Sequence, residues 1–220
     1  MRTRSTRTFA AAALLAAGAL TLTACGSGDD SGKPVAVVSE EAASDKAATV
    51  LDQPFEKPDL VLTDTHGKKY DLRKETVGRP TLIYFGYTHC PDVCPLTMNN
   101  LAVAKKSLPK AEQDELRVVF VTTDPDRDTP EELGSWLRDI DPQFIGLTGD
   151  FSTIQAGART LGIAIEPTTK DKNGKLVSVH GTQVVAFSPK TDEGYVVYGE
   201  DATVDDYTKD LPKLIEGQNP

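Results

Sequence analysis

The chain has 220 residues and a mass of 23.7 kDa, enough for one domain with appendages or for two small domains. Hydrophobic residues make up 39% and charged residues 26% of it, which excludes a multi-pass membrane protein, a collagen-like fibre and a wholly disordered chain. The formal net charge of −9 argues against nucleic acid as a partner, because such binding needs a basic face. Three cysteines are too few for a disulfide scaffold, so we expect them to carry chemistry.

The first 24 residues have the pattern of a secretory signal peptide. Three arginines and no acid lie within residues 1–8, and the apolar run over 9–22 that follows is shorter than the roughly 20 residues of a membrane span. The run ends in Leu22-Thr23-Ala24-Cys25, which resembles the lipobox of bacterial lipoproteins, with Cys25 as the lipidated residue. We therefore expect an extracytoplasmic protein held by lipid on the outer face of the cell membrane. An ordinary signal peptide with an incidental cysteine is the alternative.

Residues 25–53 are rich in Ala, Ser, Gly, Asp and Glu and contain no aromatic residue. This composition predicts a flexible linker between the lipid and the folded part of the chain. The folded domain is expected over residues 54–217, a typical size for a single domain.

Apolar runs and turn residues predict alternating strands and helices in this domain. The strands are predicted over residues 60–63, 69–72, 81–87, 116–122, 144–147, 184–188 and 195–198. The helices are predicted over residues 95–108, 130–139, 151–161 and 204–215. This order predicts an α/β three-layer sandwich. It is compatible with a thioredoxin-like domain that carries an N-terminal β-hairpin, although the order alone does not single out that fold.

Cys90 and Cys94 lie between the predicted strand over 81–87 and the predicted helix over 95–108. The end of a central strand is where α/β proteins place their chemistry. The backbone N–H groups at a helix start favour a thiolate, so we expect the pKa of the cysteines to be lowered. Positions i and i+4 share one face of a helix. Both sulfurs can therefore point at one spot, either to form a disulfide or to bind one metal ion.

A metal ion on two thiolates needs a third ligand, and without a second cysteine pair a four-sulfur zinc site is excluded. His66 lies in the predicted hairpin turn, and the side chain of His89 is expected to point away from that of Cys90. His180 directly precedes a predicted core strand, and in a thioredoxin-like sheet the loop before that strand faces the cysteine turn. We therefore predict His180 as the third ligand, with a histidine satisfied by hydrogen bonds as the alternative. Two thiolates and an imidazole suit Cu(I) or Cu(II) better than zinc, and redox-active thiols are the competing use.

Three segments carry a pattern that can be compared with known families. They are YFGYTHCPDVCP over 84–95, TDPDRDTP over 123–130 and FIGLTG over 144–149. Together they closely resemble the Sco/SenC family of membrane-anchored copper-binding proteins, and the resemblance covers about residues 59–214. It implies a thioredoxin-like fold, a role in cytochrome c oxidase assembly, and one copper ion per domain held by Cys90, Cys94 and His180.

Asp124 matches the aspartate of the family's Asp-Pro-x-Arg-Asp stretch. It either lies near the metal, where it tunes a cysteine pKa or meets a partner, or it forms a simple turn. The chain departs from the family in two places beside His180. The family usually has aspartate before this histidine, where a carboxylate can orient the imidazole, but this chain has Val179, and Gly181 follows the histidine.

The resemblance makes a copper metallochaperone the leading hypothesis. It implies delivery of copper to the dinuclear copper site in subunit II of cytochrome c oxidase, with an upstream copper donor as a further partner. A thiol–disulfide oxidoreductase that reduces the partner's cysteines through Cys90 and Cys94 is the alternative, and a copper or redox sensor stays open. A peroxidase of the peroxiredoxin type would need Thr88 and Arg127 to support the reactive cysteine, and the paired cysteines argue against it.

Overall fold

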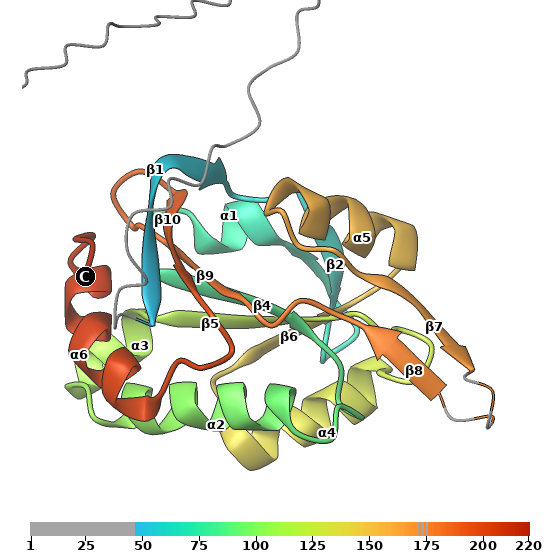
Figure 1. Cartoon of the computed structure of the whole chain (residues 1–220). Helices are drawn as coiled ribbons and strands as arrows, with labels where there is room; N and C mark the ends of the chain where they lie inside the picture. Colours follow the sequence, from blue (N-terminus) through green and yellow to red (C-terminus); the bar gives the residue numbers. More distant parts are fainter. Residues whose placement is uncertain (1–46, 171, 173, 175) are drawn as a thin grey trace, which may run out of the picture. The chain divides into compact units, whose positions relative to one another are not determined.

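The computed structural model describes residues 47–170, 172, 174 and 176–220 of the chain. The predicted signal peptide, Cys25 and the linker up to residue 46 lie outside the described residues. Within the described part, eight strands form a mixed sheet in the order β1-β10-β9-β4-β5-β6-β2-β3, and two more form a separate ribbon, β7-β8 (Figure 1). None of the helices described is long and apolar enough to cross a membrane.

The strands and helices have the following bounds. The strands of the large sheet are β1 (Ala48–Glu56), β2 (Val61–Asp64), β3 (Lys69–Asp71), β4 (Thr81–Gly86), β5 (Arg117–Thr122), β6 (Ile145–Thr148), β9 (Val184–Phe187) and β10 (Glu193–Tyr198). The ribbon consists of β7 (Glu166–Lys170) and β8 (Leu176–Val179). The helices are α1 (Leu72–Thr76), α2 (Val93–Lys106), α3 (Lys110–Glu115), α4 (Pro130–Ile140), α5 (Phe151–Thr160) and α6 (Val204–Ile215).

Strands β4 and β5 lie at the centre of the sheet. They position the loop over residues 87–92, which carries Cys90 and leads into α2 and is called the cysteine loop below. All six residues of β4 are buried, as expected for a strand covered on both faces. The two strands are parallel, and Gly86 pairs with Thr122 at their ends. The loops that follow β4 and β5 therefore leave the same edge of the sheet side by side.

Two separate cores show that the sheet is the middle of three layers. On one face, buried residues of α2, α4 and α6 pack against Leu82, Tyr84 and Phe120. On the other face, residues of α1 and α5 pack against Ile83 and Phe85, and Figure 1 shows α2 and α4 on the side of the sheet opposite α1 and α5. The predicted α/β three-layer sandwich is confirmed, and so is the hairpin β2–β3.

The start of the domain was predicted too late. Strand β1 begins at Ala48, inside the stretch 25–53 that the composition assigned to the linker. It pairs with β10 at the edge of the sheet, and the register shifts between Val50 and Phe55. Because most of its side chains are at least partly exposed, backbone pairing holds this strand, and its sequence lacks the apolar alternation of a half-buried strand.

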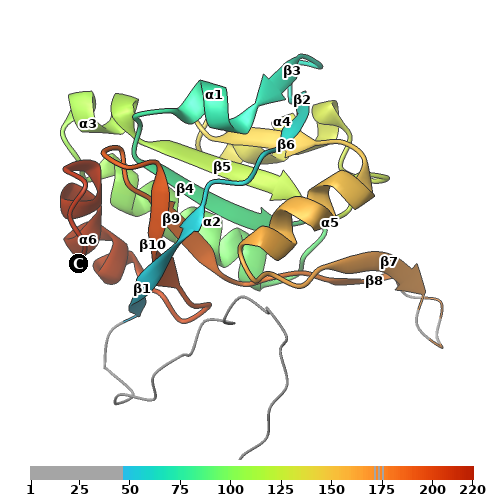
Figure 2. The ribbon, with the colours of Figure 1, turned by 90° about the horizontal axis from the view of Figure 1, so that it is seen from above.

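The ribbon β7–β8 was also missed. The residues of β7 are mostly exposed, so they provide no apolar signal for a strand. Figures 1 and 2 both show the ribbon extending from the end of α5 away from the body of the sheet. Strand β8 ends at Val179, one residue before His180.

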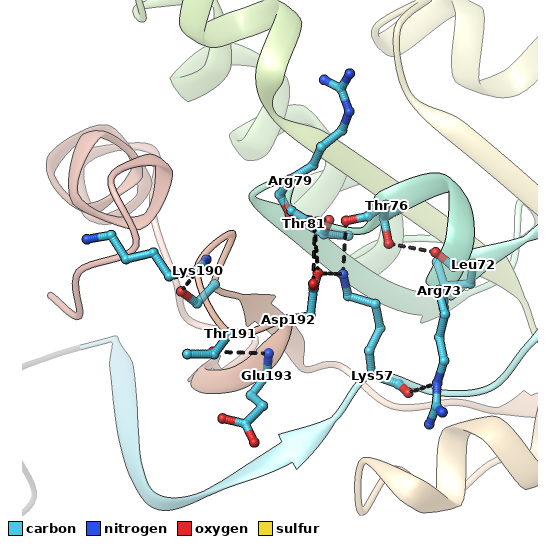
Figure 3. Close-up of polar contacts among 12 residues, drawn as sticks. Lys57, Leu72, Arg73, Thr76, Arg79, Thr81, Lys190, Thr191, Asp192 and Glu193 are labelled. Atoms are coloured by element: carbon cyan, nitrogen blue, oxygen red, sulfur yellow. Dashed lines mark hydrogen bonds and ion pairs between the residues drawn. The ribbon is translucent and has the colours of Figure 1, made fainter.

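A partly buried ion pair stabilises the end of the sheet opposite the cysteine loop. The Lys57 ammonium group donates to Asp192 at 2.7 Å and to the Thr76 carbonyl at 3.0 Å, and the Gly78 N–H donates to the same carboxylate at 3.0 Å (Figure 3). Asp192 lies in the β9–β10 turn, next to the start of β4. The pair therefore joins the end of β1, the end of α1 and this turn.

Candidate metal centre

The two cysteines lie in the turn from β4 into α2. Asp92 caps the helix by accepting from the Val93 N–H at 2.7 Å, and Cys94 follows in the first helical turn. The Cys94 N–H donates to the Cys90 sulfur at 3.4 Å. Cys90 is 6% exposed and Cys94 is fully buried, and within the described part of the chain both are free thiols.

The structure brings His180 to these sulfurs from a distant part of the sequence. Its Nε2 atom lies 3.7 Å from the Cys90 sulfur and 3.9 Å from the Cys94 sulfur. The loop between β8 and β9 carries it, as the interpretation of a thioredoxin-like sheet predicted. Of the described residues, these three form a group whose possible ligand atoms all lie within 4.8 Å of one another.

A backbone group orients the His180 ring. Nδ1 lies 2.7 Å from the Gly181 carbonyl oxygen, which can only accept a hydrogen bond, so Nδ1 carries a proton. In the neutral ring, the Nε2 lone pair then faces the sulfurs. The Tyr87 ring also packs edge-on against the imidazole at 5.1 Å between centroids. The Gly181 carbonyl thus does what the family's usual aspartate could do, while Val179 is 51% exposed.

The separations fit a metal ion bound by all three residues. With bonds of about 2.3 Å to sulfur and about 2.0 Å to nitrogen, as for zinc, two ligands 120° apart would be about 3.7 Å from each other. The measured sulfur-to-nitrogen separations are 3.7 and 3.9 Å. The donor set is soft, which suits copper, and the side chains need little movement to bind it.

The expectation that the helix start lowers the cysteine pKa is wrong for Cys94. Burial raises the pKa of this thiol to about 12, and the hydrogen bond from the Tyr84 hydroxyl at 3.4 Å offsets only part of the rise. The reason is that the sulfur lies inside the apolar core, where a lone negative charge is poorly solvated. A bound cation would supply the missing positive charge and displace the proton.

Asp128 organises the cysteine loop, a role that the sequence did not reveal. It is fully buried and accepts hydrogen bonds from the Thr88 N–H at 3.0 Å, the Thr88 hydroxyl at 2.6 Å and the Thr122 hydroxyl at 2.6 Å. It joins the end of β5 to the residues just before Cys90. The only sequence signal was its place as the last aspartate of the Asp-Pro-x-Arg-Asp stretch.

Of the two alternatives for Asp124, the structure favours the turn, and Asp124 lies outside the ligand group. Its carbonyl accepts from the N–H groups of Arg127 and Asp128, and its buried carboxylate pairs with the Arg127 guanidinium. Arg127 lies over the Tyr87 ring at 6.0 Å, so Asp124 reaches His180 only through two other side chains.

The groups that a peroxidase would need are engaged elsewhere. The Thr88 hydroxyl donates to Asp128, and Arg127 pairs with Asp124. The remaining histidines also lie outside the ligand group. His66 is strongly exposed in the β2–β3 turn, and His89 is half exposed beside Thr88 and Asp128.

The fold and this centre define a thioredoxin-like protein with a site of two thiols and one imidazole that can hold a metal ion. The family model described as SCO1/SenC matches residues 46–216. The chain therefore belongs to the SCO1/SenC family.

Known proteins agree with this assignment. A putative copper-binding protein of Stutzerimonas stutzeri is 30% identical over 174 residues, which cover 78% of this chain and 83% of that protein. The mitochondrial SCO1 homolog 1 of Arabidopsis thaliana is 31% identical over 188 residues, which cover 85% of this chain and 53% of the plant protein. The chain thus spans about half the length of this relative.

Solved structures match the domain as well. Bradyrhizobium japonicum ScoI with copper bound has a TM-score of 0.62 and 28% identity, over 74% of this chain and 98% of that one. Apo Sco1 of Thermus thermophilus has a TM-score of 0.66 and 28% identity, over 78% of this chain and 98% of the other.

Proposed function

We propose that this protein is a copper metallochaperone that delivers copper to the dinuclear copper site in subunit II of cytochrome c oxidase. The observation that carries the proposal is the placement of one imidazole nitrogen 3.7 and 3.9 Å from the two cysteine sulfurs. Membership of the SCO1/SenC family and the likeness to a Sco protein with copper bound support copper as the cargo. One copper ion per domain, as Cu(I) or Cu(II), would be held by Cys90, Cys94 and His180.

The three ligands differ in how firmly the protein holds them. Cys94 is enclosed in the core, whereas His180 is partly exposed on the loop after β8. A neutral imidazole on a separate loop is the natural first ligand to leave when a partner's ligand arrives. Copper would then pass to the partner while both thiolates still hold it, so no free ion is released.

The proposed location follows from the start of the chain. The pattern Leu22-Thr23-Ala24-Cys25 supports lipidation of Cys25 and anchoring on the outer face of the cell membrane. Subunit II and an upstream copper donor are the proposed partners at that surface.

An anaerobic Cu(I) titration of the reduced full chain in detergent, with a competing chelator, tests the metal site. We expect one tightly held copper ion per chain, lost in Cys90→Ser and Cys94→Ser and weakened in His180→Ala. Transfer of that copper to the metal-free soluble domain of subunit II then tests delivery. Retention of copper by both cysteine variants would contradict the site, and failure to transfer would contradict delivery.

A second candidate function is thiol–disulfide exchange. The two sulfurs lie within 4.8 Å of each other, and the Cys90 sulfur is the more exposed of the two. Oxidation of both thiols to a disulfide would pass two electrons and two protons to a partner disulfide and leave it as two thiols. His180→Ala separates the functions, because exchange with a disulfide should survive this change whereas copper retention should not.

A further inference from the structure

A buried tyrosine touches one of the two sulfurs. Tyr84 lies in β4 and is fully buried in the core. It donates its hydroxyl proton to the Cys94 sulfur at 3.4 Å. Its ring packs against Phe120 with centroids 5.9 Å apart. The contact therefore joins the central strand of the sheet to the first turn of α2.

The backbone next to this contact leaves room for it. A Cβ atom at Gly86 would lie 2.6 Å from the Tyr84 ring and 2.8 Å from the Cys94 sulfur. Because both distances are below van der Waals contact, a side chain at position 86 would push the ring and the sulfur aside. A glycine at the end of β4 is what lets these two groups meet.

Packing alone does not account for the hydroxyl. A phenylalanine would fill the same space without a polar group to satisfy, and a buried tyrosine hydroxyl needs a partner. Here the partner is the sulfur of a proposed metal ligand. Both sulfurs face His180, but the Cys90 sulfur accepts from the Cys94 N–H at 3.4 Å and lies 4.0 Å from the Asp92 carboxylate.

We propose that Tyr84 is a positioning residue that fixes the Cys94 sulfur toward His180 and weakens its donation of electrons. A hydrogen bond to a ligating thiolate withdraws charge from the sulfur and thereby tunes the metal. This part of the inference rests on the proposed copper site. A second consequence concerns the metal-free protein and needs no copper.

In the metal-free protein the hydroxyl favours the reduced pair. The Cys90–Cys94 disulfide takes up two electrons and two protons to become two thiols, and with glutathione as reductant two glutathione molecules become one glutathione disulfide. Tyr84 donates to the thiol sulfur, which is a better acceptor than a disulfide sulfur. Loss of the hydroxyl should lower the equilibrium constant for reduction about tenfold, which is about 30 mV for this two-electron couple.

Tyr84→Phe in the full chain tests the inference, with Tyr198→Phe as the matched control. Tyr198 is equally buried in the same core, and its hydroxyl donates to Asp210 at 3.2 Å, so its loss also removes one internal hydrogen bond. We expect Tyr84→Phe to shift the dithiol equilibrium about tenfold toward the disulfide and to move the sulfur-to-Cu(II) charge-transfer band to lower energy. Tyr198→Phe should change neither.

The outcomes separate this inference from the proposed function. An unchanged equilibrium and an unchanged band in Tyr84→Phe would overturn the role of Tyr84, and so would equal shifts in both variants. If the unmodified protein fails to retain copper, the proposed function is wrong, and the equilibrium with glutathione alone still decides whether Tyr84 acts on Cys94.

Discussion

The two halves of the candidate metal centre are built differently. The cysteine half is part of the core: it follows a fully buried strand, Cys94 is enclosed, and Asp128 and Tyr84 hold it by hydrogen bonds. The histidine half is peripheral, because His180 follows the mostly exposed ribbon β7–β8 and its ring is held by the next residue's carbonyl.

This difference predicts separate roles for the ligands: the sulfurs would hold the ion, and the imidazole would come and go. Sulfurs fixed in a core need no ordering when they bind a cation, so little entropy is lost there. An imidazole on an outer loop can leave or return without disturbing the core. Under the proposed function, the centre would combine retention of copper with a route for its exchange. Each of the following experiments tests one half against the other.

The largest expected effect concerns the reactivity of the enclosed sulfur. Because burial raises the pKa of Cys94 to about 12, the thiolate needed for alkylation is scarce at neutral pH. In metal-free Cys90→Ser, the rate of reaction with iodoacetamide should rise about tenfold per pH unit. At pH 9, three units below this pKa, the rate should still be about a thousandfold lower than the maximum reached when the thiol is fully ionised.

The matched variant is Cys94→Ser, which leaves the more exposed Cys90 sulfur, and it should react faster at every pH up to 9. Mass spectrometry of timed samples measures both rates. A rate in Cys90→Ser that levels off below pH 9 would show that the enclosure of Cys94 does not control its protonation.

The second effect is on stability. Asp128→Ala leaves two hydroxyls and one N–H without their buried acceptor. The loss should lower the free energy of unfolding by about 3 kcal/mol, a factor of about a hundred in the folding equilibrium. Urea denaturation measures it, and copper affinity should fall as well because the cysteine loop loses its attachment to β5.

Asp192→Ala is the control at the opposite end of the sheet. It leaves the buried ammonium of Lys57 with the Thr76 carbonyl as its remaining acceptor, so it should cost a similar free energy, about 3 kcal/mol. Copper affinity should stay unchanged in the folded fraction. If both variants lose copper affinity equally, general destabilisation explains the loss, and Asp128 has no special part in the centre.

The sequence predicted the core of the fold better than its periphery. Strands β4 and β5 and helices α2, α4, α5 and α6 were predicted close to their observed bounds, because long apolar runs and helix caps are local signals. Strands β1, β7 and β8 and the short helices α1 and α3 were missed. They depend on backbone pairing or on single turns, which leave little trace in the pattern of apolar residues.

The same limit applies to the site. The three proposed ligands could be named from the sequence, because chemically distinctive residues flank predicted strands. Asp128 and Tyr84 could not, since their roles depend on contacts with residues 40 and 10 positions away. The direction of the pKa shift of Cys94 was predicted wrongly for a related reason. A helix start is visible in the sequence, but the depth of burial of a side chain is not.

The third effect concerns the histidine half. A Cβ atom at position 181 would lie 2.4 Å from the Ile163 side chain, so Gly181→Ala must displace the loop that carries His180. Copper affinity should fall about tenfold, the lower end of what loss of a ligand's supporting contact costs, and a chelator competition measures it.

Gly67→Ala is the control for replacing a glycine. Gly67 has a φ of +75° and no neighbour within 4 Å of an added Cβ, so alanine there should cost about 1 kcal/mol of stability and no copper affinity. Unchanged affinity in Gly181→Ala would mean that the His180 loop tolerates displacement and that its position is not fixed by the contact with Ile163.

The smallest expected effect distinguishes the two histidines nearest the cysteines. His89 adjoins Cys90 in sequence, but its ring is half exposed, and its Nδ1 lies 3.0 Å from the Thr88 hydroxyl and 3.6 Å from Asp128. His89→Ala should therefore change copper affinity by less than about twofold, whereas His180→Ala should weaken it by well over tenfold. The same chelator competition measures both variants. Equal losses would mean that proximity to Cys90 in sequence matters as much as the loop geometry, and the peripheral histidine would no longer be the distinct half of the centre.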